Sequence, residues 1–510
     1  MFDLGRTFLQ SVERRPQRLA IVDGELRLSY AQWFERIRCV AGALAGLGLQ
    51  PGDHLAVVLQ NRWETATLHW ACQFLGVIVT PLNWRAKADE LDYCVVDANA
   101  RAIVYEPVSA DAVTDAASCR SIPRIAAGGA EGATHAFEQL LEGNPPAQML
   151  GATAEDCSLM LYTSGTTGRP KGVPRRHRAE RAAALAHVAQ NQYAVGEVTL
   201  GVMPLYHTMG VRSLLAMALV DGTFVCLPRF DVSEALRLIR AEKVTNLYLV
   251  PTLYHDLLGH PDFARADVST VKRIGFAGAP MNDALLKRLA DAFRPQLFVN
   301  HYGSSEIYTF TIDQLAPAKP GSAGRAGFNT RIRVVQLDAA GEKSAPDALA
   351  KPGEEGQIIA DLRGDEAFEG YWKRPDADAK ALRAGWYFTG DTGYIDPDGD
   401  LYVTGRVDDM IICGGENISP VDIESVLSLH PAVDEVAVAG LPDERWGQKV
   451  VAFVKAKGPV DAQGLDDYCR GSVLPNYKRP REYVFVQAVP KSPVGKILRR
   501  KLISGEYDKA

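Results

Sequence analysis

The stretch Tyr162-Thr163-Ser164-Gly165-Thr166-Thr167-Gly168-Arg169-Pro170-Lys171-Gly172 decides the fold assignment, because it joins an apolar run to a loop rich in glycines, hydroxyls and cations. The apolar run Leu159-Met160-Leu161 before it predicts a buried strand. Such a loop offers backbone N–H groups and hydroxyls to phosphate oxygens, and its glycines allow close approach. The nucleotide-binding pattern G-x-x-x-x-G-K-[ST] does not fit, because Gly172 follows Lys171 and the glycine spacing differs. We therefore expect a phosphate-binding loop of another kind.

Bulk properties predict an intracellular protein with more than one domain. The chain has 510 residues, of which 47% are hydrophobic and 23% are charged, and a net charge of -6. This is an ordinary globular composition at a length that exceeds one core, without a basic surface for nucleic acid. The eight cysteines form no C-x-x-C pair, the first residues lack a signal-peptide core, and no apolar run reaches spanning length. We expect a cytoplasmic protein without a zinc site, a disulfide framework, a nucleic-acid partner or a membrane span.

Helical and strand patterns alternate through much of the chain. Repeated strand–helix–strand units predict an α/β fold, in which a parallel sheet is covered by helices on both faces. The expected helices are residues 30–47 and 63–74, and the expected strands are residues 55–59, 77–79, 103–105, 223–227, 247–250 and 271–274.

The pattern changes after about residue 320, where glycines and prolines separate short strands such as residues 357–359. A compact unit of about one hundred residues then begins near Arg406. Its expected elements are a helix at residues 420–429, strands at 433–439 and 450–455, a helix at 464–473 and a strand at 483–486.

Several further motifs stand at separate places along the chain. They are M-P-L-Y-H-T-M-G (residues 203–210), G-F-A-G-A-P (275–280), N-H-Y-G-S-S-E (300–306), G-W-Y-F-T-G-D (385–391), G-R-V-D-D-M-I (405–411) and P-K-S-P-V-G-K-I (490–497). With the loop at residues 162–172, and in this order, they resemble the motifs of the adenylate-forming enzymes. That superfamily includes acyl-CoA synthetases, peptide-synthetase adenylation domains and firefly luciferase. The resemblance covers nearly the whole chain and is nearest to aryl-CoA ligases such as 4-chlorobenzoate–CoA ligase. Ser305 departs from the family's threonine but retains the hydroxyl.

The resemblance implies a division of the chain into two domains and a hinge. Residues 1–405 would form an AMP-binding domain, with parallel-rich sheets layered with helices and a small β-barrel-like subdomain. Residues 406–409 would form the hinge, with Asp408 as its pivot. Residues 410–510 would form a small mobile α+β domain that carries the catalytic lysine.

The same resemblance implies which residues hold Mg-ATP. Tyr302 would stack on adenine, and Glu306 would help to bind Mg²⁺. Asp391 would accept both ribose hydroxyls, while Arg406 would contact ribose or phosphate. Lys496 would be the catalytic lysine, offsetting the charge that builds as one anion attacks another. The other expected nucleotide-binding residues are Thr163, Ser164, Gly165, Thr166, Thr167, Gly168, Lys171, Gly278, Ala279, Pro280, Gly303, Ser304 and Ser305.

For the acid, the implied pocket is mostly apolar and aromatic, which favours an aromatic or alicyclic carboxylate. His207 would gate the passage between the acyl site and the thiol tunnel, rather than act as an acid or base. If Arg212 points inward, a malonate-type dicarboxylate is an alternative substrate. A medium-chain fatty acid is another, because some pocket residues are small. The pocket residues are Ala186, His207, Tyr248, Ala279, His301, Gly303, Ile307 and Tyr308.

For coenzyme A, the resemblance implies a glycine-containing loop and a cationic, aromatic set. The residues Gly414, Gly415, Glu416 and Asn417 would face the pantetheine tunnel. Phosphates and a purine suit cations and an aromatic ring. The expected set is Trp446, Lys478, Arg479 and Arg481.

Together these features predict an ATP-dependent, AMP-forming carboxylic acid–CoA ligase that uses Mg²⁺ and coenzyme A. A stand-alone adenylation enzyme that loads a carrier protein, a luciferase-like oxidase and an inactive nucleotide-binding regulator are the alternatives. The regulator is disfavoured because Lys496, Glu306 and Asp391 are all present. A homodimer is one of the assemblies that the sequence allows.

Overall fold

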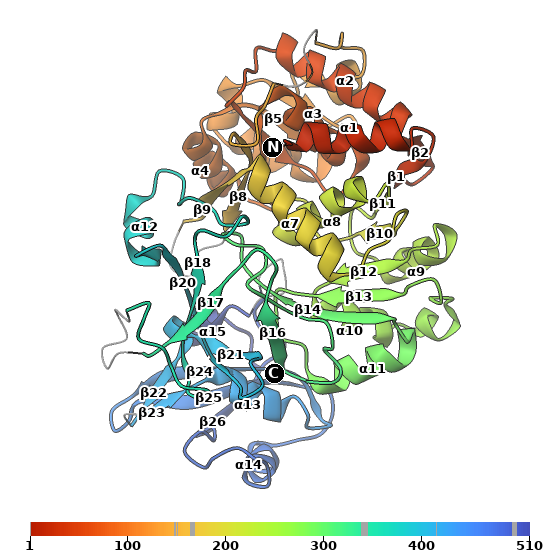
Figure 1. The fold of residues 1–510 in the computed structure, drawn as a ribbon. Helices are drawn as coiled ribbons and strands as arrows, with labels where there is room; N and C mark the ends of the chain where they lie inside the picture. Colours follow the sequence, from red (N-terminus) through yellow and green to blue (C-terminus); the bar gives the residue numbers. More distant parts are fainter. Residues whose placement is uncertain are drawn as a thin grey trace.

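The computed structural model describes residues 2–146, 149, 151–163, 169–337, 345–414, 416–491 and 497–510. Two large sheets lie in the N-terminal part of the chain, and a smaller sheet belongs to the C-terminal part, shown in blue in Figure 1. None of the helices within these ranges has both the length and the apolar character that crossing a membrane needs.

The first sheet holds the strand that leads into the phosphate loop. Its strands are parallel apart from the final pair, in which Thr163 lies opposite Lys171 in an antiparallel hairpin. The strand expected before the loop is thereby confirmed. In sheet order the strands are β7 (His135–Ala136), β6 (Arg124–Ala126), β5 (Ala100–Tyr105), β3 (His54–Val58), β4 (Ile78–Pro81), β8 (Cys157–Thr163) and β9 (Lys171–Arg176).

The second sheet is longer and changes direction partway. Its neighbours from β11 through β10, β12, β13 and β14 are parallel, and those from β14 onward are antiparallel. In order the strands are β17 (Ile332–Val335), β18 (Gly356–Asp361), β20 (Trp386–Ile395), β21 (Leu401–Arg406), β16 (Ser322–Ala326), β15 (Thr311–Asp313), β14 (Leu297–Tyr302), β13 (Arg273–Phe276), β12 (Asn246–Leu249), β10 (Val198–Gly201), β11 (Thr223–Cys226), β1 (Leu19–Asp23) and β2 (Leu26–Ser29), with β19 (Leu382–Arg383) beside β20.

The expected β-barrel-like subdomain is not confirmed. The short strands after residue 320 continue the hydrogen-bonded path of the second sheet, through β16, β21, β20, β18 and β17. Their antiparallel pairing agrees with the glycine- and proline-rich sequence, because tight turns can join antiparallel strands whereas parallel strands need long crossovers.

The C-terminal sheet has its own apolar core. Ile411, Leu427, Val438, Val450 and Leu465 are buried together there. In order the strands are β23 (Glu416–Ile418), β22 (Ile411–Cys413), β25 (Gly447–Ala456) and β24 (Val433–Asp443), with β26 (Glu482–Phe485) pairing with β25.

The helices begin where the sequence supplies caps. Ser29 and Gln32 form a capping box at the start of α2, so that two otherwise unpaired N–H groups are satisfied. The helices are α1 (Leu4–Arg14), α2 (Tyr30–Gly46), α3 (Trp63–Leu75), α4 (Ala88–Ala98), α5 (Ala110–Asp115), α6 (Phe137–Leu140), α7 (His177–Gln190), α8 (Thr208–Leu219), α9 (Val232–Ala241), α10 (Pro251–Gly259), α11 (Asp283–Phe293), α12 (Pro375–Ala381), α13 (Pro420–Leu427), α14 (Ala462–Arg470) and α15 (Arg499–Ile503).

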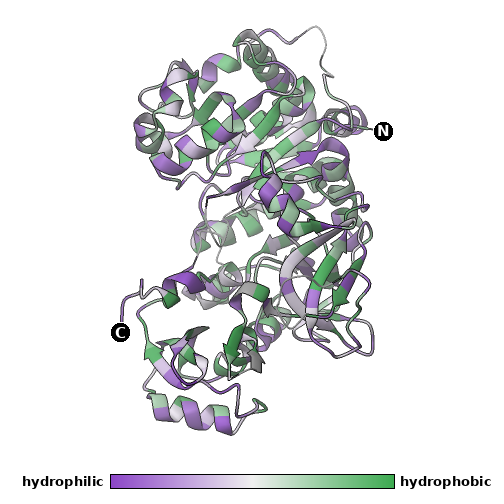
Figure 2. Cartoon of the chain, turned by 90° about the vertical axis from the view of Figure 1, so that its left-hand side faces the viewer, coloured by the Kyte–Doolittle hydropathy of each residue, from purple (hydrophilic) through white to green (hydrophobic). Residues whose placement is uncertain are grey.

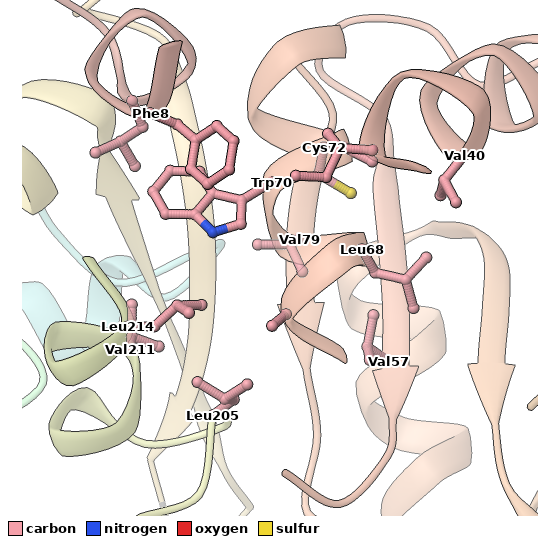
Figure 3. Packing of buried hydrophobic residues seen from close by; sticks show 14 of the residues in the cluster. Phe8, Val40, Val57, Leu68, Trp70, Cys72, Val79, Leu205, Val211 and Leu214 are labelled. Atoms are coloured by element: carbon pink, nitrogen blue, oxygen red, sulfur yellow. The ribbon is translucent and has the colours of Figure 1, made fainter. Parts of the chain in front are cut away.

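Apolar residues gather inside these layers, as the green interior strands of Figure 2 show. Figure 3 shows Phe8 of α1 against Trp70 of α3, with Val211 and Leu214 of α8 in the same cluster. The ring centroids of Phe8 and Trp70 lie 4.6 Å apart. Because Val211 and Leu214 are locked into this core, the rotation of α8 about its axis is fixed. That rotation also fixes where Arg212, one of the two residues between them, can point.

Candidate active site

The candidate site lies where parallel strands of the second sheet end. Strands β12, β13 and β14 run side by side in register, so their carboxyl ends meet at one edge. Ligands of open α/β sheets bind outside the carboxyl ends of the strands. The predicted Tyr302 is the last residue of β14, and the predicted Gly278 follows β13 with a φ of +84°, a conformation that favours glycine.

Tyr302, Asp391 and Arg406 form one hydrogen-bonded group at this edge. The Tyr302 hydroxyl donates to Asp391 Oδ2 at 2.5 Å, and Arg406 donates to Asp391 Oδ1 at 2.8 Å. Burial, and then the negative charge of Asp391, raise the pKa of Tyr302 well above its ordinary value. Tyr302 is therefore a neutral hydrogen-bond donor. It positions the carboxylate of Asp391, which the sequence analysis expects to accept the ribose hydroxyls.

Glu306 and Lys171 both contact Tyr371. The Tyr371 hydroxyl donates to Glu306 Oε1 at 2.6 Å, and Lys171 Nζ lies 3.9 Å from the centroid of the Tyr371 ring. Burial lowers the pKa of Lys171, while the nearby Glu306 carboxylate opposes that shift. Sequence reasoning missed Tyr371, although it lies in the aromatic stretch Phe368–Trp372, before the 385–391 motif. We call Lys171, Tyr302, Glu306, Tyr371, Asp391 and Arg406 the nucleotide-side cluster.

The turn after Tyr302 places Glu306 in this cluster. A Cβ on Gly303 would lie 2.0 Å from the carbonyl oxygen of Tyr308, so only glycine fits. Ser304 Oγ accepts from the backbone N–H of Glu306 at 3.2 Å and of Ile307 at 3.3 Å. The Ser304 side chain therefore shapes the turn in this structure, and Ser305 lies within the same turn.

The predicted phosphate loop is described only at its two ends. Thr163 Oγ1 lies 3.4 Å from the carbonyl oxygen of Lys171, across the base of the β8–β9 hairpin. Ser164, Gly165, Thr166, Thr167 and Gly168 lie outside the described residues. Ala279 and Pro280 follow Gly278 in the loop after β13, where they are partly or fully exposed.

On the acyl side, the structure brings Tyr248 and His301 together, with ring centroids 5.2 Å apart. Ala186, Ile307 and Tyr308 are also buried, Ala186 on α7 and the other two after β14. Three polar residues were absent from the predicted pocket: His187, Asn191 and Arg212. Arg212 was noted only as a caution, and its side chain reaches the hydroxyl of Tyr248.

His207 sits at the N-cap of α8, and its Nδ1 accepts from the backbone N–H of Met209 at 3.3 Å. An accepting Nδ1 places the proton of a neutral imidazole on Nε2.

The predicted coenzyme A residues are largely paired with acidic partners. Lys478 Nζ lies 2.5 Å from Asp422 Oδ2, and Arg479 forms an ion pair with Asp466. Trp446 is 40% exposed and packs on Gly414, whose φ is +62°. Arg481 is exposed beside β26. The predicted pivot Asp408 lies in the short 3₁₀ helix Val407–Asp409, while Gly415 and Lys496 lie outside the described residues.

Two family models match separate parts of the chain. The family model of the AMP-binding enzymes matches residues 8–372, and that of the AMP-binding enzyme C-terminal domain matches residues 422–496. The chain is 34% identical to a 4-chlorobenzoate–CoA ligase from Arthrobacter sp, over 96% of this chain and 93% of that protein. It is 32% identical to a long-chain-fatty-acid–CoA ligase of Mycobacterium tuberculosis, over 98% of each chain.

Solved structures of CoA ligases superpose over nearly the whole chain. An anthranilate–CoA ligase in complex with anthranoyl-AMP superposes with a TM-score of 0.89 at 26% identity, over 99% of this chain and 97% of that one. An O-succinylbenzoate–CoA synthetase from Bacillus subtilis, in complex with ATP and magnesium ion, superposes with a TM-score of 0.84 at 28% identity. That alignment covers 97% of this chain and 98% of the other.

Proposed function

Because the chain belongs to the AMP-binding enzyme family and is an AMP-forming carboxylic acid–CoA ligase, we propose that its acid is aromatic or alicyclic and that its C-terminal residues separate two half-reactions. The packed rings of the acyl side, Tyr248 with His187 and His301, support an aromatic or alicyclic acid, and the nucleotide-side cluster supports the adenylation step. That cluster gathers two phenols, two carboxylates and two cations at the carboxyl edge of the second sheet.

In the first half-reaction, a carboxylate oxygen of the acid attacks the α-phosphorus of ATP. The bond from that phosphorus to its bridging oxygen breaks, so that an acyl-adenylate forms and pyrophosphate leaves. Asp391, held by Tyr302 and Arg406, would accept the ribose hydroxyls. Lys171 and Lys496 would offset negative charge, as in other phosphoryl transfers, where catalysis is positioning and electrostatics.

The residues present fit a magnesium ion. Mg²⁺ keeps several waters and needs only one or two protein carboxylates beside substrate phosphates. Glu306 is such a carboxylate, and the Tyr371 hydroxyl fixes one of its oxygens. When bound, the ion would neutralise phosphate charge and orient the phosphate groups.

In the second half-reaction, the thiol of coenzyme A loses its proton and attacks the acyl carbon, and AMP leaves. We propose that the domains are residues 1–405 and 410–510, and that residues 406–409 turn about Asp408 between the steps. The turn would withdraw Lys496 and bring Gly414 and Gly415 to the thiol tunnel. Such a motion explains how one small domain serves two steps. Trp446, Lys478 and Arg479 would contact the nucleotide end of coenzyme A, the two cations after exchanging their acidic partners.

The test is pyrophosphate release with Mg-ATP against a panel of carboxylic acids, each with and without coenzyme A. We expect aromatic or alicyclic acids to turn over fully only with coenzyme A present. If pyrophosphate appears at the same rate with and without it, the acceptor is another molecule, such as a carrier protein, and the second half-reaction is wrong.

A further inference from the structure

Three buried nitrogens on the acyl side have no hydrogen-bond partner among the residues that the structure describes. They are His187 Nε2, Arg212 Nε and His301 Nδ1. The exposed fractions of these residues are 0%, 2% and 2%. Buried polar atoms are almost always hydrogen-bonded in folded proteins, so three unpartnered nitrogens close together call for an explanation. We call His187, Arg212 and His301 the buried donor cluster.

The cluster lies between the second sheet and the helices that cover it. His301 is on β14 and His187 is on α7, and their ring centroids are 5.3 Å apart. Tyr248 of β12 joins them, with its ring 4.9 Å from His187. Strand β13 lies between β12 and β14, and its Gly275 leaves room for the Tyr248 ring. A Cβ at that position would lie 2.8 Å from the ring.

Asn191 contacts both imidazoles. Its Nδ2 lies 3.0 Å from His187 Nδ1 and 3.1 Å from His301 Nε2, whereas its Oδ1 is farther from His301, at 3.4 Å. Asn191 Nδ2 also donates to the backbone carbonyl oxygen of His187 at 2.8 Å, so its two hydrogens face three acceptors. Burial and the charge of Arg212 hold the pKa of both imidazoles well below the ordinary value, so each is neutral. Each neutral ring therefore presents either a hydrogen or a lone pair at its unpartnered nitrogen, His187 Nε2 and His301 Nδ1.

Arg212 differs from the other fully buried arginine, Arg175. Arg175 Nε lies 2.8 Å from a carboxylate oxygen of Glu180. Arg212 donates instead to neutral oxygens, the Thr309 hydroxyl at 2.7 Å, the Tyr308 carbonyl at 3.3 Å and the Tyr248 hydroxyl. Within the described ranges it forms no ion pair with a carboxylate. A buried cation without a contacting anion is costly, and a ligand oxygen would relieve that cost.

Arg212 Nε belongs to a cation and always carries hydrogen, so the cluster offers a donor that lacks a matching acceptor among the described residues. We propose that the buried donor cluster selects a carboxylic acid whose far end carries an acceptor oxygen, such as a hydroxyl, keto or second carboxylate oxygen. This inference rests on the proposed function and narrows its substrate class.

The direction of the strand supports this placement. Neighbouring residues of a strand point to opposite faces, so His301 points away from the face where Tyr302 holds Asp391. The reacting carboxylate would lie at the sheet edge near the nucleotide-side cluster. The far end of the acid would then reach the helix-covered face, where Tyr248 and Tyr308 border the cluster.

A purely structural role predicts a different outcome. Glu366 accepts from the backbone N–H of Thr309, and it lowers the cost of the Arg212 charge without touching it. If this were the whole role of Arg212, replacing it would affect every acid equally. A role in selection changes the ratio between acids with and without an acceptor oxygen.

The experiment measures kcat/KM for pyrophosphate release with benzoates that carry methyl, hydroxyl or carboxylate at the 3- or 4-position. Methyl and hydroxyl are similar in size, so their ratio reports the hydrogen bond. For the wild type we expect a hydroxyl or carboxylate acid to exceed its methyl counterpart by at least about tenfold, because a site built for a polar group rejects analogues that lack it. The hydroxyl and carboxylate arms distinguish a neutral acceptor from an anionic one.

The variants Arg212→Met and His301→Leu should each bring that ratio close to one. His69→Leu is the matched control, because it removes an equally buried imidazole with an unpartnered Nε2 from α3 and should preserve the ratio. If Arg212→Met does not fold, His301→Leu carries the test. Preference for the methyl acids in the wild type, or an equal loss for all acids in the variants, overturns the inference and leaves the proposed function intact. Inactivity toward every carboxylic acid overturns both.

Discussion

The nucleotide-side cluster and the buried donor cluster lie on opposite faces of β14 and are completed in opposite ways. In the first, every charge has a contact within the protein, from Asp391 with Arg406 to Glu306 with Tyr371. In the second, the buried Arg212 cation contacts only neutral oxygens among the described residues. The difference suggests that side chains within the protein already position the groups that bind ATP. On the acyl side, the acid would supply the missing acceptor. Each prediction below tests one side of that contrast.

The largest effect is expected at Lys496, which we place with the nucleotide side although it lies outside the described residues. Lys496→Ala should lower adenylate formation by about 10²- to 10³-fold, the usual cost of removing one group that stabilises transition-state charge. Thioester formation from supplied acyl-adenylate should be nearly unchanged, because that step does not need the lysine. Pyrophosphate exchange and thioester assays measure the two steps separately, with exposed Lys457→Ala as the control. Equal losses in both assays would remove Lys496 from its role.

The next largest effect is expected at Asp391. Asp391→Asn keeps the shape but removes the charge that Tyr302 and Arg406 both contact. Because hydrogen bonds to charged groups contribute about 1.5–3 kcal/mol, the KM for ATP should rise by roughly tenfold to a hundredfold. The preference among acids should stay the same. A changed acid preference would show that the two clusters are coupled, and an unchanged KM would show that Asp391 does not hold the nucleotide.

A smaller effect is expected at Tyr371. Tyr371→Phe removes the hydroxyl 2.6 Å from Glu306 and keeps the ring beside Lys171. Losing one hydrogen bond to a charged group should lower kcat/KM by about tenfold and raise the Mg²⁺ concentration for half-maximal activity. Tyr394→Phe, in a stacked pair with Tyr402, is the control. If the activity falls but the Mg²⁺ dependence does not move, Tyr371 acts on something other than the Glu306 site.

The order of helices and strands and the nucleotide side could be predicted from the sequence, whereas the donor cluster could not. Tyr302, Glu306 and Asp391 stand in ordered motifs whose residue types match their chemistry, so short stretches of sequence identify them. Tyr371 and Asn191 act through contacts across 65 and 110 positions of the chain, to Glu306 and His301. No local pattern carries such contacts. The barrel-like subdomain was expected from resemblance, and the same short strands instead extend the second sheet.

The smallest effect concerns the neutral state of the buried imidazoles. Burial lowers the pKa of His54 and His177 to about 4, and it holds the pKa of His187 and His301 well below the ordinary value. Such a group binds its proton more readily in the unfolded chain. Its contribution to stability is therefore complete above the unfolded value of about 6.5 and is lost as the pH falls toward the folded value.

Buried carboxyl groups with raised pKa values, such as Glu64 and Glu366, act with the opposite sign as the pH falls. Comparing the wild type with a variant that differs only at His301 isolates the contribution of this imidazole to the pH dependence of stability. The slope of unfolding free energy against pH between about pH 4.5 and 6.5 should be flatter in His301→Asn than in the wild type, by up to about 1.4 kcal/mol per pH unit. Thermal unfolding would register this as about a degree or two per pH unit. Parallel slopes in His301→Asn and wild type would mean that His301 is charged inside the fold, and a charged His301 would make the acyl side resemble the nucleotide side.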